Sequence, residues 1–149
     1  MNFKQKIYAR CCELLNEKIL SLKNSLLELE EGSENDSKSS AGDKHETARA
    51  MMQIEQGKLS KQLNEALEQK VVLEKINAGG SPSQITNGSL VITNKGFLFI
   101  GVALGKIVVD EKPVIVISSQ SPLGLKLLGL KVNDATEIMG IKYTIENFD

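Results

Sequence analysis

Asp43 and Glu46 are two carboxylates three positions apart, near one end of the most acidic stretch of the chain. Residues 28–46 hold seven acidic residues against two lysines, a local net charge of −5. If residue 43 begins a helix, a spacing of three puts both carboxylates on one face. Such a pair can be presented to a metal ion in the cleft of another protein. It can equally be a capping box favoured by the helix dipole, or plain solvation of a loop.

Residues that could support other chemistry are scarce. Cys11 and Cys12 are adjacent in a helix-like segment, so they point in different directions and build no disulfide framework. With His45 as the single histidine, a zinc site has too few ligands and a Cys–His nucleophile is disfavoured. The net charge of −1 gives no basic excess that would hold nucleic acid. These shortages disfavour most enzyme chemistries that use a protein's own side chains.

The composition is that of an ordinary soluble chain. Its 149 residues are 41% hydrophobic and 25% charged, which predicts one domain or two small ones. No stretch approaches the roughly 20 apolar residues that span a bilayer. The first residues, Met-Asn-Phe-Lys-Gln-Lys, lack the apolar region of a signal peptide. These features predict a cytoplasmic protein with no membrane partner.

The first half of the chain has the pattern of a helical hairpin. Apolar residues alternate at spacings of four and three, as in a coiled-coil seam: Tyr8, Cys12, Leu15, Ile19, Leu22, Leu26 and Leu29. A second, less regular seam contains Met52, Leu59, Leu63, Ala66 and Leu73. We predict antiparallel helices over about 2–31 and 45–77, joined by an acidic tip loop near 32–43. The alternative is a dimer in which two hairpins bury each other's seams.

The second half, after a break at 77–82, has the pattern of a small sheet. It contains all three prolines and nine of the twelve glycines. Short β-branched or aromatic runs alternate with turn residues, at 89–92, 97–102, 106–109, 114–117, 135–139 and 141–148. Ser121-Pro122 favours a short helix at 123–130. We predict an α+β fold: a hairpin domain at 1–77 and an antiparallel sheet domain with one short helix at 78–149.

Several motifs resemble the bacterial Gre factors, which bind RNA polymerase and stimulate cleavage of backtracked transcripts. Gly42-Asp43-Lys44-His45-Glu46 is similar to the family's tip motif, and Glu55-Gln56-Gly57 to the Glu-Gln-Gly stretch of its second helix. Ser121-Pro122-Leu123-Gly124 with Leu127-Leu128-Gly129 is similar to a helix of its second domain, and Lys142-Tyr143-Thr144-Ile145 stands where that domain has its closing strand. These motifs occur in the family's order and spacing, and the resemblance extends over nearly the whole chain.

The resemblance implies a coiled-coil hairpin followed by an FKBP-like domain that docks on RNA polymerase. It implies that the tip enters the secondary channel, where Asp43 and Glu46 are the catalytic residues and help to hold a second Mg²⁺ beside the active centre. That ion would be shared with the polymerase, with no cofactor bound permanently. Lys44 and Arg49 could then contact phosphates at the backtracked RNA 3′ end. The expected state is a monomer.

Two rival interpretations remain open. After Glu46 the family usually continues Asn-Ala-Glu-Tyr, whereas this chain reads Thr47-Ala48-Arg49-Ala50. A Gre-like regulator that occupies the channel without stimulating cleavage would fit that change. The other rival is a coiled-coil adaptor or chaperone-like protein whose hairpin binds a helix or a client, with a tip that is acidic only for solvation.

Overall fold

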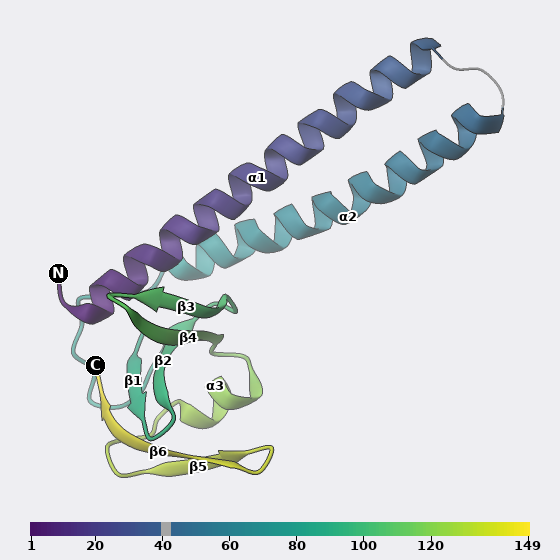
Figure 1. The fold of residues 1–149 in the computed structure, drawn as a ribbon. Coiled ribbons are helices and arrows are strands. Elements are labelled where there is room, and N and C mark those ends of the chain that lie inside the picture. Colours follow the sequence, from purple (N-terminus) through teal and green to yellow (C-terminus); the bar gives the residue numbers. More distant parts are fainter. Residues whose placement is uncertain (40–42) are drawn as a thin grey trace. The chain divides into compact units, whose positions relative to one another are not determined.

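The computed structural model describes residues 1–39 and 43–149; for 33–39 and 43–45 it describes the backbone alone. The chain forms a helical hairpin followed by a sheet with one short helix, which confirms the predicted fold class (Figure 1). It divides into two compact units. One contains Leu14–Lys70, and the other joins Met1–Glu13 to Val71–Asp149. None of the helices in the described residues is both long and apolar enough to cross a membrane.

The unit Leu14–Lys70 consists of parts of two antiparallel helices, α1 (Phe3–Ser39) and α2 (Asp43–Glu74) (Figure 1). Burial follows the predicted seams. The buried side chains are Leu15, Ile19, Leu22 and Ala66, and the half-buried ones include Leu26, Leu29, Met52, Leu59 and Leu63. Near the acidic end, the Met52 methyl lies 3.5 Å from where a Cβ on Gly32 would be. Met51, the neighbour of Met52, is 66% exposed, because adjacent helix positions face different directions.

The helix α1 is longer than the sequence pattern predicts. Its backbone stays helical to Ser39, past the expected end at residue 31. The segment has no proline, and an isolated Gly32 costs a helix only about 1 kcal/mol relative to alanine, so nothing in it stops the helix. Of the tip loop expected near 32–43, residues 40–42 lie outside the described residues.

The described residues 90–148 form a six-stranded sheet of order β3-β4-β2-β1-β6-β5. The strands are β1 (Leu90–Thr93), β2 (Gly96–Gly101), β3 (Gly105–Val109), β4 (Lys112–Ser118), β5 (Ala135–Ile138) and β6 (Ile141–Phe148). Both predicted hairpin turns join antiparallel neighbours, β1 with β2 and β3 with β4. However, β2 pairs with β4 in parallel, so the expectation of a purely antiparallel sheet was wrong.

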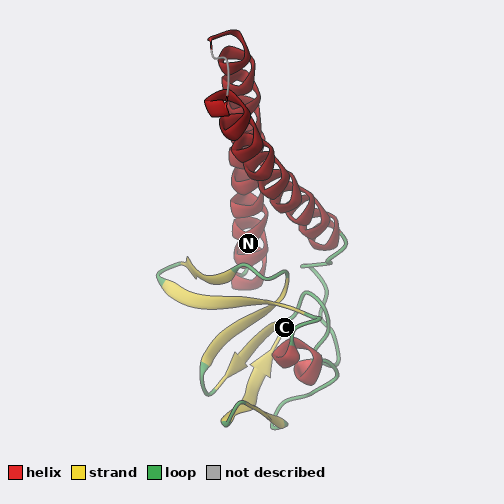
Figure 2. Cartoon of the chain, turned by 90° about the vertical axis from the view of Figure 1, so that its right-hand side faces the viewer, coloured by secondary structure: helices red, strands yellow, loops and turns green. Residues whose placement is uncertain are grey.

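The short helix α3 (Pro122–Leu127) covers one face of the sheet (Figure 2). Its Leu127 is fully buried in a core built from several elements: Ile85, Val91, Leu98, Ile100 and Ile145. The helix begins as predicted. Ser121 is the N-cap, and its hydroxyl accepts a hydrogen bond from the Gly124 amide at 3.0 Å, while Pro122 occupies the first turn.

The first turns of α1 pack in the same unit as the sheet. The rings of Phe3 and Phe97 meet edge to face at 5.3 Å, and the Lys6 ammonium donates to Asp110 at 2.9 Å. Phe99, which strand alternation puts on the same face as Phe97, is fully buried. These contacts fix the start of the hairpin to the sheet.

Gly57 lies in the interior of α2, where an alanine should stabilise the protein. The residue is exposed, and a Cβ there would have no atom within 4 Å. Gly57→Ala is expected to raise the free energy of unfolding by about 0.5–1 kcal/mol, because alanine loses less backbone entropy in a helix. Chemical denaturation followed by circular dichroism measures the change. Gly140→Ala, also in open space but at φ +80°, should lower stability instead.

Two side chains of α1 have raised pKa values, from which we predict that the protein is less stable at alkaline pH. Burial raises the pKa of the Cys11 thiol from 9.0 to about 12, and the neighbouring Cys12 adds to the shift. Burial and Cys12 also raise the pKa of Tyr8, whose hydroxyl donates to the Leu73 carbonyl at 2.8 Å. Because the folded state keeps the Cys11 proton longer than the unfolded state, stability should fall as pH rises from 9 to 12. In Cys11→Ala the slope of unfolding free energy against pH should be shallower; an unchanged slope would contradict this assignment.

Candidate functional site: the acidic end of the hairpin

The two sequence-predicted site residues lie at the start of α2. The helix begins at Asp43, and Glu46 follows within the first turn with its side chain exposed. Positions 43 and 46 of a helix lie on one face, as the spacing predicts. The side chains of Asp43, Lys44 and His45 lie outside the described part of the structure, so the pair's geometry stays a prediction.

The bounds of α2 bear on the capping alternative. With Asp43 as the first helical residue, the N-cap position preceding it is residue 42, which lies outside the described residues. A capping box of Asp43 and Glu46 would need Asp43 itself as the N-cap, so that alternative stays a prediction. The carboxylates of the first turn are still favoured by the helix dipole, which is positive at this end.

Negative charge gathers around this end of the hairpin. Glu28, Glu30 and Glu31 on α1 are all exposed, as is Glu46 on α2. Their exposure leaves the carboxylates hydrated and available to a cation. Arg49, one turn after Glu46, is also exposed, so a positive side chain borders the acidic region.

Two carboxylates alone would leave most of the coordination of an Mg²⁺ ion to other ligands. Among the described side chains, no group of three or more His, Cys, Asp or Glu residues is placed to hold a metal ion. Mg²⁺ is octahedral and is usually bound by one or two carboxylates, with waters and substrate filling the other positions. Asp43 and Glu46 could supply those two ligands, provided that the remaining coordination comes from another molecule.

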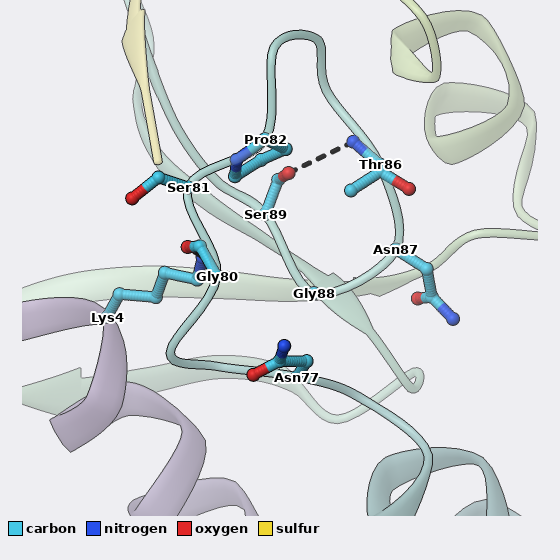
Figure 3. Close-up of a pocket in the computed structure, with 9 residues that line it drawn as sticks. All are labelled: Lys4, Asn77, Gly80, Ser81, Pro82, Thr86, Asn87, Gly88 and Ser89. Carbon is cyan, nitrogen blue, oxygen red and sulfur yellow. Dashed lines mark hydrogen bonds between the residues drawn. The ribbon is translucent and has the colours of Figure 1, made fainter.

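A cavity with several polar side chains in its wall lies in the unit that contains the sheet, and the sequence did not predict it (Figure 3). Its volume is about 240 Å³. It is lined by Lys4, by Asn77, by residues 80–82 and by residues 86–89. All of these residues except Lys4 belong to the segment 77–89 between α2 and β1, and folding brings Lys4 of α1 against that segment. The one local signal was the Gly/Ser/Pro composition of residues 79–82.

No protein-family model matches the sequence, and no curated protein matches it. A solved structure of the transcription factor Gfh1 is similar over 92% of this chain and 92% of that chain, at 17% sequence identity and a TM-score of 0.37. This degree of likeness does not assign the chain to a family.

Proposed function

We propose that the chain is a Gre-like transcription elongation factor. It binds RNA polymerase, inserts the acidic end of its hairpin into the secondary channel and stimulates cleavage of backtracked transcripts. The observation that supports this best is the position of Asp43 and Glu46 in the first turn of α2, at the end of a long helical hairpin. Between residues 14 and 39, α1 rises by roughly 40 Å, enough to reach a deep site.

In this proposal the chain's own residues bind and orient. Asp43 and Glu46 offer carboxylate oxygens from one helix face to an Mg²⁺ that the polymerase also holds. When bound, a second Mg²⁺ would help to stabilise the attacking and leaving oxygens of phosphodiester cleavage. Arg49 and Lys44 would hold the RNA 3′ end through its phosphates. The polymerase carries out the reaction, so the chain is not an enzyme by itself.

The exposed apolar side chains of the hairpin favour a second candidate, the coiled-coil adaptor. In the unit Leu14–Lys70 the side chains of Leu20, Leu27, Met51 and Ile54 are 57–73% exposed. A second hairpin or a client helix could cover them. The mass in solution separates the two functions: the Gre-like proposal predicts a monomer of 16.3 kDa, whereas a stable dimer that buries these side chains would favour the adaptor.

The experiment that tests the proposed function is a transcript-cleavage assay on backtracked complexes of the cognate polymerase. The purified chain should bind the polymerase and increase the rate of cleavage in the presence of Mg²⁺. Binding without faster cleavage would point to a regulator that occupies the channel. If the chain does not bind the polymerase at all, the polymerase proposal fails and the adaptor remains.

A further inference from the structure

The polar cavity contains a buried ammonium group that the proposed function does not use. The side chain of Lys4 is only 2% exposed, which is unusual for a lysine. Its Nζ donates a hydrogen bond to the Gly80 carbonyl at 2.9 Å. Its nearest carboxylate, on Asp149, is 3.7 Å away and 44% exposed. Because an ammonium carries three donors, Lys4 has one left after these two partners.

A second donor points into the same space. The Asn77 side chain accepts a hydrogen bond from the Gly79 amide at 3.1 Å through its Oδ1. Its amide nitrogen has no hydrogen-bond acceptor among the described residues. It points into the space between Gly80 and Gly88 (Figure 3). The loop opposite is held in place by the Ser89 hydroxyl, which accepts from the Thr86 amide at 3.0 Å.

The wall that carries Gly88 is rigid, so the cavity is a formed one. Gly88 has φ +91°, and a Cβ there would lie 2.5 Å from the Ile76 side chain. Its amide donates to the Ile100 carbonyl, and the Ser89 amide donates to Thr86. Packing and the backbone hydrogen bonds therefore fix this wall against the sheet.

Charge and size restrict what the cavity can hold. The Asp149 carboxylate already pairs with the charge of the Lys4 ammonium, so what the ammonium offers a ligand is its remaining N–H donor. Hydrogen bonds between an ammonium and an anion are among the stronger ones. The cavity's volume of about 240 Å³ corresponds to roughly eight waters and is below the 300–1,000 Å³ of drug-sized sites. We propose that the cavity binds a small oxyanion of the size of phosphate or sulfate, through the Lys4 ammonium and the Asn77 amide.

Titration of the full-length chain with inorganic phosphate, followed by the backbone amide signals in NMR spectra, tests this inference. Chloride at matched ionic strength serves as the blank. Phosphate should shift the amides of residues 77–89 saturably, with a Kd of about 1 mM or tighter. Nucleoside monophosphate in a parallel arm distinguishes a free ion from a phosphate group on a larger molecule. Binding of the nucleotide but not of free phosphate would overturn the inference.

Two variants and a matched control sharpen the test. Asn77→Asp keeps the acceptor for the Gly79 amide but replaces the donor by a negative charge, so phosphate affinity should fall at least tenfold. Lys4→Met should also lower phosphate affinity at least tenfold. If the Lys4→Met variant does not fold, the phosphate affinity of Asn77→Asp alone tests the inference. Asn147→Asp is the control, because Asn147 is exposed, accepts from the next amide at 2.9 Å and lies outside the cavity. Wild-type affinity in Asn77→Asp, or shifts that do not saturate, would overturn the inference, which is independent of the polymerase proposal.

Discussion

Replacing Glu46 by Gln, or Asp43 by Asn, should reduce stimulated transcript cleavage at least a hundredfold while the chain still binds polymerase. Each change removes one negative charge from the first turn of α2 and keeps the size of the side chain. A neutral amide is a poor Mg²⁺ ligand compared with a carboxylate, so the shared ion would lose an anchor. A displacement of only about 1 Å at a reacting centre can cost a hundredfold in rate. Single-turnover cleavage rates and polymerase affinity are the two measurements.

A charge-matched control separates a ligand role from general acidity. Glu30→Gln removes the same charge from an exposed position of the same acidic stretch, on α1. It should leave cleavage within about twofold, since long-range charge at an exposed site is screened by salt. If Glu30→Gln reduced cleavage as much as Glu46→Gln, the acidic end would act through bulk charge and the ligand role would be wrong.

Gly124→Ala should strongly lower the stability of the sheet-containing unit. A Cβ on Gly124 would overlap the Ser118 carbonyl and would lie 2.9 Å from the Ser121 Oγ. That hydroxyl caps α3 and donates to the same Ser118 carbonyl at 2.7 Å. Overpacking and loss of the cap together should cost about 3 kcal/mol or more. The measurement is the free energy of unfolding by chemical denaturation.

The same substitution in open space is the control. Gly57→Ala adds the same methyl group to a helix without a neighbour within 4 Å and should be stabilising. A stability loss of less than 1 kcal/mol in Gly124→Ala would mean that the segment 118–121 can move away. The close packing of α3 against β4 would then be less important than the contacts indicate.

The elements of the sheet could be predicted because their local patterns are strong. Residues 141–148 form β6 as predicted, and the other strands and α3 differ from prediction by a few residues. Pro113 and Ile115 are exposed while Val114 and Val116 are buried, so alternation along β4 marks a strand with one covered face. The heptad seams predicted the helices for the same reason, although near the start of α1 the buried residues are Ile7 and Cys11 rather than the predicted Tyr8 and Cys12.

What the sequence did not predict depends on contacts between distant residues. Alternation identifies a strand but not its neighbour, so the parallel pairing of Leu98 with Ile115 had no local signal. Polar composition at 33–39 suggested a loop, but composition alone does not end a helix, and the backbone stays helical to Ser39. The burial of Lys4 depends on Gly80 and Asp149, which are far away in the chain.

Part of the candidate site could be predicted from the sequence. Asp43 and Glu46 are three positions apart, so both lie in the first turn of a helix that begins at residue 43, as α2 does. Their proposed role came from the resemblance of the surrounding motifs, because two acids near a helix start have several possible uses. The cavity around Lys4 and Asn77 was not predicted, because Lys4 is far in the chain from the segment 77–89 that forms the rest of its wall.

Cross-linking from the acidic end of the hairpin tests the central claim most directly. Ala50 is exposed, one turn after Glu46, and can be replaced by the photoreactive residue benzoylphenylalanine. In a backtracked complex of the cognate polymerase, irradiation should join position 50 to the lining of the secondary channel near the active centre and to the RNA 3′ end. Cross-links only to the outer surface of the polymerase, or only to a second copy of the chain, would contradict the proposed insertion.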